Sequence, residues 1–129
     1  MQDMIYLFLA PGFEEVEALC PLDLLRRAGL AVTTVGVGGD VIVGAHGIAV
    51  GADIPDTMFR DSKPEMIILP GGMPGSLNLD ASPYANEFIA AAIRNGGHIA
   101  AICAAPTVLA ALHITDDKKA TCYPGMEDR

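Results

Sequence analysis

The sequence Ile99-Ala100-Ala101-Ile102-Cys103-Ala104-Ala105-Pro106-Thr107 is a short apolar strand that stops at a cysteine and continues at once as a helix. Alanines stand two positions before and two after Cys103, as in a nucleophile elbow, where larger side chains do not fit. Pro106 suits a first helical turn, because the N–H that it lacks has no partner there. Unpaired backbone N–H groups and the helix dipole lead us to expect a thiolate at Cys103. For this stretch alone, the alternative is an inert cysteine in an alanine-rich core strand.

Short apolar strands and helices alternate along the rest of the chain. Strands are expected over residues 4–9, 31–37, 66–69 and 99–102, a hairpin over 41–43 and 48–50, and a last strand over 120–123. Helices are expected over residues 14–28, 83–95 and 106–112. This alternation predicts a doubly wound α/β fold, with a mostly parallel sheet between helices on both faces.

Length, charge and cysteine content limit the class of protein. The 129 residues suffice for one domain, residues 1–129, and not for two. A net charge of −8 argues against binding to nucleic acid or to an anionic membrane surface. Three cysteines without paired spacing argue against a disulfide framework, and the longest apolar run, residues 99–112, is too short to span a bilayer. We expect a cytoplasmic protein.

In a sheet of this kind, ligands bind beyond the carboxyl ends of the strands. Three loops are expected to meet there, namely residues 10–17, residues 70–75 and the turn at Cys103. The first loop has one glycine and three acids, which would repel a pyrophosphate, and the second lacks the Lys-Ser/Thr pair of a phosphate loop. The sequence therefore disfavours a nucleotide site and predicts no cofactor.

These loops offer a thiol, a carboxylate and backbone donors. Gly71 and Gly72 allow the main chain to approach a ligand closely, and their N–H groups could form an oxyanion hole with that of Ala104. The alternative is that Pro-Gly-Gly is only a tight exit from the strand.

Glutamates 14, 15 and 17 all lie at the start of the first expected helix. Glu17 is one turn into that helix among apolar residues, so we expect it to be partly buried and to share a proton with Cys103. From the residues alone the three acids are nearly indistinguishable, and the alternative is a solvated helix face.

The histidines offer no obvious partner for the cysteine. His98 precedes Cys103 by five residues, and strand alternation sends the two side chains to opposite faces. His46, at the hairpin tip, could reach a neighbouring subunit. No Cys/His spacing resembles a metal site, so no metal is expected. Cys20 and Cys122 are predicted to be structural, with Cys122 the more exposed of the two.

Four motifs, in this order, resemble the ThiJ/PfpI superfamily, in the branch of the Parkinsonism-associated deglycase. They are APGFEEVE at 10–17, RRAG at 26–29, LPGG at 69–72 and AAICAAPT at 100–107, and the resemblance covers essentially the whole chain. It implies a flavodoxin-like three-layer sandwich, a homodimer, and an elbow cysteine that is nucleophilic and readily oxidised.

The resemblance also assigns roles. It implies that Cys103 is the nucleophile and that Glu17 is the family's protonated glutamate, hydrogen-bonded to the sulfur. The oxyanion donors fall on Gly72 and Ala104, with Gly71 beside them. His46 stands where family members often reach across the dimer towards the partner's site.

Two departures from the family pattern matter. Tyr123 stands where some members carry a histidine near the cysteine, which disfavours a His-assisted peptidase. Members of this branch also continue for some tens of residues with further strands and a final helix, whereas this sequence stops at Arg129. We expect that edge of the domain to be lacking or to be supplied by another chain.

Two functions follow as expectations. The first is a cofactor-free enzyme of the glyoxalase III or deglycase type, in which Cys103 attacks a small α-oxoaldehyde such as methylglyoxal and Glu17 moves the proton. The second is an oxidative-stress sensor or redox-regulated chaperone, in which Cys103 becomes a sulfinate. A peptidase ranks third.

Overall fold

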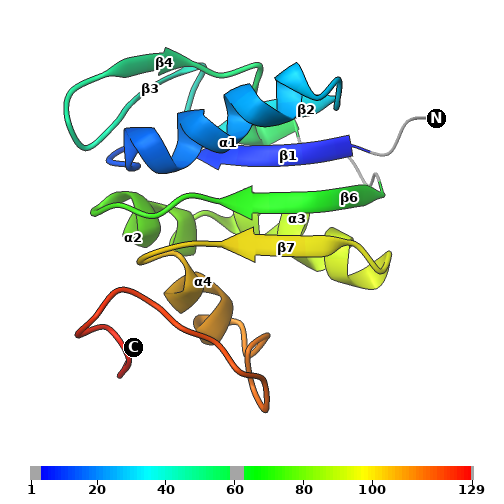
Figure 1. Ribbon diagram of the computed structural model, residues 1–129, viewed down its shortest axis with the longest axis vertical. Coiled ribbons are helices and arrows are strands. Elements are labelled where there is room, and N and C mark those ends of the chain that lie inside the picture. The colour runs from blue at the N-terminus through cyan, green and yellow to red at the C-terminus, as the bar shows by residue number, and fades with distance from the viewer. Residues whose placement is uncertain (1–3, 59–62, 129) are drawn as a thin grey trace.

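The computed structural model describes residues 4–58 and 63–128 and contains a five-stranded parallel sheet (Figure 1). Across the sheet, the strands are β5 (Ile54–Pro55), β2 (Val32–Gly36), β1 (Met4–Leu9), β6 (Pro64–Leu69) and β7 (His98–Ala101). Every neighbouring pair is parallel. The predicted α/β fold is confirmed. The strands expected over residues 4–9, 31–37, 66–69 and 99–102 correspond to β1, β2, β6 and β7, whereas the two-residue strand β5 was not predicted.

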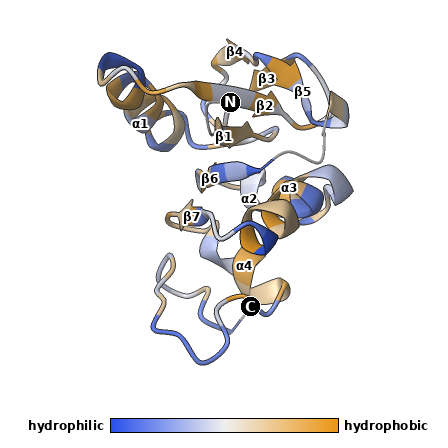
Figure 2. Ribbon diagram, turned by 90° about the vertical axis from the view of Figure 1, so that its right-hand side faces the viewer, coloured by the Kyte–Doolittle hydropathy of each residue, from blue (hydrophilic) through white to orange (hydrophobic). Residues whose placement is uncertain are grey.

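Helices cover the two faces of the sheet unequally (Figure 2). Helix α1 (Glu15–Arg27) lies on one face, whereas α2 (Gly75–Asp80), α3 (Pro83–Arg94) and α4 (Pro106–Ala111) pack on the other. The short helix α2 was not predicted, because its glycine, serine and asparagine favour turns over helices. A 3₁₀ turn, η1 (Asp56–Met58), follows β5.

Alternate residues of β1 build two separate cores. Tyr6 and Phe8 point to the face of α3, where their rings meet the edge or face of Phe88 at centroid distances of 4.9 and 5.0 Å. Ile5 and Leu7 point to the face of α1. Since successive side chains of a strand project to opposite faces, a fully apolar strand such as β1 must be covered on both sides.

The predicted hairpin is confirmed as β3 (Val41–Val43) paired with β4 (Ala49–Gly51) in a small antiparallel sheet. It is fixed to the loop after β1, because Gly12 N–H donates to the Val43 carbonyl (2.9 Å) and Ala45 N–H to the Phe13 carbonyl (2.8 Å). The hairpin therefore lies beside the start of α1.

The strand predicted over residues 120–123 is wrong. This segment is an irregular loop, and in the described part of the chain the sheet ends at β7. Its apolar pattern finds no strand to pair with, and a strand exists only where its backbone groups are bonded to a neighbour. Tyr123 N–H donates instead to the carbonyl of Cys103 (2.7 Å).

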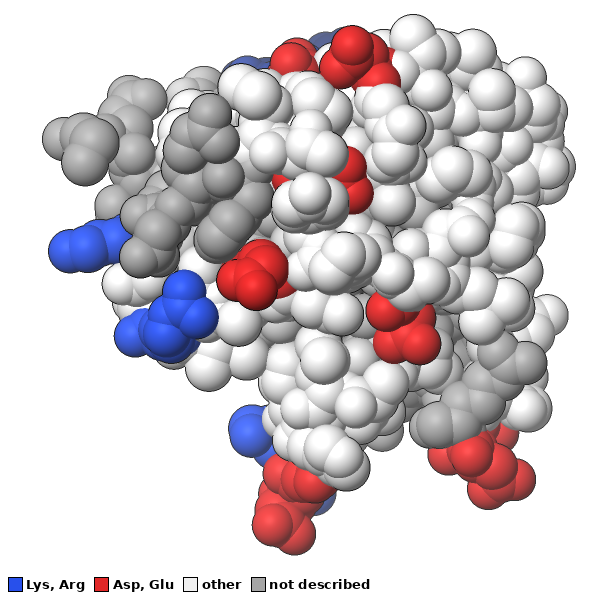
Figure 3. All heavy atoms as spheres, turned by 180° about the vertical axis from the view of Figure 1, so that it is seen from behind, with Lys and Arg blue, Asp and Glu red and all other residues white. Residues whose placement is uncertain are grey.

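No helix in the described ranges is long and apolar enough to cross a membrane. Seen from behind, the surface carries separate acidic groups on a largely uncharged background, and no single acidic patch (Figure 3).

Candidate active site

Cys103 occupies a strained turn between β7 and α4. Its φ is 63°, in the left-handed region that non-glycine residues rarely adopt, and such a conformation costs on the order of 1–3 kcal/mol. The turn is closed by Ala105 N–H, which donates to the Ile102 carbonyl (3.0 Å). A strand, a cysteine at positive φ and a helix in direct succession make the nucleophile elbow that the sequence predicted.

The three predicted loops meet at this elbow. Gly71 N–H, after β6, donates to Glu17 Oε1 (3.0 Å). A Cβ on Gly71 would lie 2.6 Å from Glu17 Oε1 and 2.8 Å from Cys103 Cβ, so glycine is required here. The half-buried Glu17 also hydrogen-bonds the Cys103 thiol. The structure thus distinguishes Glu17 from the two acids before it.

The expectation of a thiolate is wrong for this arrangement. Burial raises the pKa of the Cys103 thiol above its ordinary value of 9.0, and the negative charge of Glu17 raises it further. The bond from Ala104 N–H to the sulfur lowers the pKa of the thiol, but by less than burial and Glu17 raise it. Burial and the charge of Glu17 therefore favour the protonated thiol over the thiolate, and Glu17 is the acidic side chain in contact with it.

The predicted oxyanion donors lie at the elbow with one correction. Gly71 N–H is already bonded to Glu17, so it is not a donor for a ligand. Gly72 N–H stays a predicted donor, whereas Ala104 N–H bonds the Cys103 sulfur and would have to exchange that bond for one to a ligand. Gly72 has a φ of 100° and packs tightly on the backbone of the loop after β1, because its missing Cβ would lie 2.5 Å from Glu14 N. Only glycine fits this place, which holds the main chain close to Cys103.

Glu15 and His46 form a clamp that the sequence did not predict. The buried Glu15 carboxylate accepts bonds from His46 N–H (2.8 Å) and Ile48 N–H (3.3 Å), and its other oxygen lies 3.0 Å from His46 Nδ1. Burial alone would raise the pKa of Glu15, but the bonds from His46 and Ile48 outweigh it and lower the pKa to about 2. The bond to Glu15, with the charge of Glu14, raises the pKa of His46 above 6.5.

Metal-ligating side chains come together at this clamp. One donor atom each from Glu14, Glu15 and His46 lie within 4.8 Å of one another. Because both Glu15 oxygens already serve the hairpin, the arrangement fits a structural clamp better than a metal site. The absence of a metal from the function stays a prediction.

The remaining histidines lie away from the elbow. His98 begins β7 at the amino end of the strand, whereas Cys103 follows the carboxyl end. His113 lies beyond the last turn of α4, and its Nδ1 is 3.2 Å from Asp116 Oδ2. Tyr123 adjoins the elbow through its backbone bond to Cys103, and its side chain is exposed. A histidine partner for the thiol within this chain is thus not apparent among the three.

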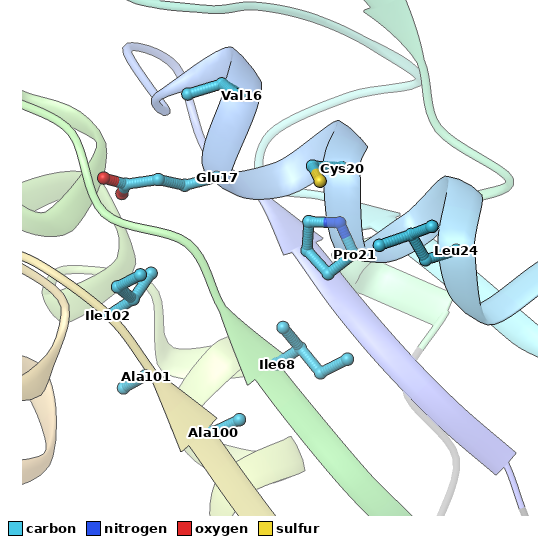
Figure 4. Close-up of a pocket in the computed structure, with 9 residues that line it drawn as sticks. All are labelled: Val16, Glu17, Cys20, Pro21, Leu24, Ile68, Ala100, Ala101 and Ile102. Atoms are coloured by element: carbon cyan, nitrogen blue, oxygen red, sulfur yellow. The ribbon is translucent and has the colours of Figure 1, made fainter.

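An apolar groove of about 480 Å³ extends from Glu17 between α1 and the strands β6 and β7 (Figure 4). The helix contributes Val16, Cys20 and Leu24 to its lining, and the opposite side is lined by Ile68, Ala100 and Ile102.

The two other cysteines differ in exposure. Cys20 is exposed and Cys122 is half-buried, so the prediction that Cys122 is the more exposed of the two is wrong. Cys20, which was predicted to be structural, lies on the exposed part of α1.

Similarity to known proteins identifies the family. Residues 3–129 match the DJ-1/PfpI family. Protein dj-1beta of Drosophila melanogaster is 37% identical over 98% of this chain and 68% of its own length, and the glutathione-independent glyoxalase DJR-1.2 of Caenorhabditis elegans is 35% identical over 90% of this chain. The structure of oxidized Toxoplasma gondii DJ-1 superposes with a TM-score of 0.92 at 30% identity, covering 98% of this chain and 70% of the other.

The chain spans 61% of the Caenorhabditis glyoxalase and about two thirds of the fly protein. The match over nearly all of its residues, together with the shared fold, confirms the resemblance that the four motifs indicated. This chain belongs to the DJ-1/PfpI family.

Proposed function

We propose that the chain is a cofactor-independent cysteine enzyme of the glyoxalase III or deglycase type, which acts on small α-oxoaldehydes or their adducts. One observation carries the proposal. The Glu17 carboxyl bonds the Cys103 thiol at the elbow, with the Gly71 N–H holding that carboxyl in place. The name of the Caenorhabditis relative, a glutathione-independent glyoxalase, supports the same chemistry.

In this mechanism Cys103 and Glu17 act as a pair. Glu17 takes the thiol proton as the sulfur attacks the aldehyde carbon of methylglyoxal, and the N–H groups of Gly72 and Ala104 bond the developing oxyanion. Proton return to that oxygen gives a hemithioacetal. Glu17 then takes the proton from the former aldehyde carbon, which gives an enediol, and returns it to the neighbouring carbonyl carbon. The hydroxyl proton of the hemithioacetal passes to the neighbouring oxygen, so that the product is a thioester of lactate. Water hydrolyses the thioester, so methylglyoxal and water become lactate and the thiol is restored.

The test is methylglyoxal consumption with lactate as the measured product. Cys103→Ala is expected to abolish turnover, and Glu17→Gln to reduce kcat by roughly 100- to 10,000-fold, the usual contribution of a positioned acid or base. Cys20→Ala and Glu87→Gln are the matched controls, because both replace exposed residues outside the elbow. Undiminished turnover in Cys103→Ala would overturn the proposal.

A redox sensor is the second candidate. It is favoured by the hydrogen bond between Glu17 and the sulfur, which would stabilise a sulfinate when Glu17 carries a proton. The oxidized state of the Toxoplasma relative points the same way. Mild peroxide is expected to add two oxygen atoms at Cys103, located by peptide mass. Oxidation confined to Cys20 or Cys122 would count against a sensor at the elbow.

A redox-regulated chaperone and a homodimer, with His46 reaching the partner's site, stay predictions. A peptidase has the least support, since the three histidines of the chain lie at the hairpin clamp, the far end of β7 and the far end of α4. Gel filtration of the purified chain tests the oligomeric state directly.

A further inference from the structure

A second cavity, of about 340 Å³, opens at the carboxyl edge of the sheet beside the start of α3. It lies between the ends of β1, β2 and β5 and the turn that joins α2 to α3, and its lining includes neither Cys103 nor Glu17. The volume is that of a small-molecule site, and no lysine or arginine is among the described residues that line it. Its polar side chains are those of Asp56, Thr57, Asn78, Ser82 and Tyr84.

Asp56 brings a buried carboxylate with neutral partners to this cavity. It is 5% exposed, and it accepts hydrogen bonds from Gly38 N–H (3.3 Å) and from the Ser82 hydroxyl (3.2 Å). Both bonds are long for an ionised acceptor, whose bonds are ordinarily about 2.5–2.9 Å. In the described ranges of the chain, no lysine, arginine or histidine forms an ion pair with Asp56. The carboxylate therefore has capacity for a further, charged donor.

Two other acids of the chain do have a basic partner. Glu15, which is 6% exposed, has its Oε1 3.0 Å from His46 Nδ1. Even Asp53, whose side chain is 47% exposed, has its Oδ2 2.7 Å from Arg26 Nη2. Asp56 is as deeply buried as Glu15 but is bonded by neutral donors. Because a buried charge is costly without an opposite charge, a cation in the cavity would stabilise the Asp56 carboxylate.

We propose that this cavity binds a small organic cation, with its ammonium group at Asp56 and its apolar part against Tyr84. Aromatic rings attract organic ammonium groups through the negative face of the ring, and Tyr84 lines the same cavity as the carboxylate. Asn78 Nδ2 donates to the Pro11 carbonyl (2.7 Å), which leaves Asn78 Oδ1 as a further acceptor. An anion, in contrast, would meet the charge of Asp56. The site is separate from the elbow, so the proposal does not depend on the proposed function.

Benzylamine and benzyl alcohol are suitable probes, because they share their size and ring but differ in charge at neutral pH. Each is titrated into isotope-labelled protein, and the backbone amide signals are followed by NMR. The Gly38 amide donates to Asp56 and therefore reports on that carboxylate. We expect benzylamine to shift the Gly38 signal saturably, with a dissociation constant in the millimolar range. Benzyl alcohol should bind roughly tenfold more weakly, the effect of losing one charged hydrogen bond.

Variants at the cavity separate the carboxylate from the ring. Asp56→Asn should weaken benzylamine binding roughly tenfold, because the amide keeps an acceptor for Gly38 N–H but removes the charge. Asp80→Asn is the matched control, since it removes an exposed carboxylate of α2 outside the cavity, and it should leave the affinity unchanged. Tyr84→Leu should weaken binding roughly threefold and leaves the carboxylate in place. The amide spectrum of each variant shows whether it is folded.

Three results would overturn the proposal. The first is the absence of a saturable shift with benzylamine, and the second is equal affinity of the native protein for the two probes. The third is equal weakening by Asp56→Asn and Asp80→Asn, which would mean that the net charge of −8 attracts the amine. If Asp56→Asn does not fold, the two probes on the native protein and on Tyr84→Leu decide the question.

Discussion

The two faces of the sheet differ in how completely they are covered. On one face, α2, α3 and α4 enclose a core in which Phe88 packs against two aromatic rings of β1. On the other, α1 covers β1 and β2 but leaves the groove over β6 and β7 open, with Val16, Leu24 and Ile102 exposed. The reactive groups lie at the carboxyl edge beside the open face. The helix that follows the elbow packs in the core of the closed face, whereas the groove of the open face reaches Glu17 beside the elbow.

Removing a ring from the closed face should have the largest effect on stability. Phe88→Ala is expected to lower the free energy of unfolding by about 3–5 kcal/mol, because Phe88 is fully buried and contacts both Tyr6 and Phe8. Urea unfolding followed by circular dichroism measures the change. Phe88→Leu, a smaller truncation, serves if the alanine variant does not fold. A loss below about 1 kcal/mol would mean that this face is no better packed than the open one.

At the carboxyl edge of the sheet, the addition of a single methyl group should lower the enzymatic activity. Gly71→Ala places a Cβ 2.6 Å from Glu17 Oε1 and 2.8 Å from Cys103 Cβ, so the two side chains must move apart. We expect methylglyoxal turnover to fall roughly 100-fold, as for an angstrom-scale misplacement of reacting groups. Gly51→Ala is the control, because a Cβ on Gly51 meets nothing within 4 Å. Equal turnover in the two variants would show that the contact is not needed.

The contribution of the Glu15–His46 clamp to the free energy of unfolding should depend on pH. Glu15, with its pKa lowered to about 2, stabilises the fold above its ordinary pKa of 4.5, and this stabilisation is lost as the pH falls towards 2. His46, with its pKa raised, contributes fully below 6.5, and its contribution is lost as the pH rises through the raised value. Glu15→Gln should therefore destabilise most between pH 4.5 and 6.5.

Urea midpoints of Glu15→Gln and the native protein, compared at about pH 3, 5.5 and 9, measure this dependence. Glu87→Gln supplies the baseline for the loss of one exposed carboxylate. If the difference between Glu15→Gln and the native protein is the same at all three values, the clamp is not held by charge.

The smallest effect is expected on the open face itself. Leu24 is 60% exposed at the groove, so Leu24→Ala should change the free energy of unfolding by no more than about 0.5 kcal/mol. The measurement is the same urea titration as for Phe88→Ala, which makes the two faces directly comparable. A loss similar to that of Phe88→Ala would show that the groove is covered in solution.

The sequence predicted the strands and the elbow, whose conformation depends on residues that are close together in the chain. The apolar run of β1 and the small residues around Cys103 gave the strand and the elbow correctly, since hydrophobic periodicity and steric room act within a few positions. Residues 120–123 look like a strand but pair with no strand in the described part of the chain, and pairing with a distant segment cannot be read from a local pattern. The clamp joins Glu15 to His46 across 31 positions, so only the folded chain reveals it. The raised pKa of Cys103 likewise depends on the folded chain, because it comes first from burial and then from the charge of Glu17 on a distant helix.

The bond from Gly71 N–H to Glu17 Oε1 also decides where a proton can sit on that carboxyl group. A carbonyl oxygen accepts an N–H bond better than a hydroxyl oxygen does, so a protonated Glu17 keeps Oε1 as its C=O and carries hydrogen on Oε2. The main chain thereby selects one of two tautomers. In the proposed mechanism, the proton that Glu17 carries therefore travels through Oε2, and the backbone of the loop after β6 sets the direction of its delivery.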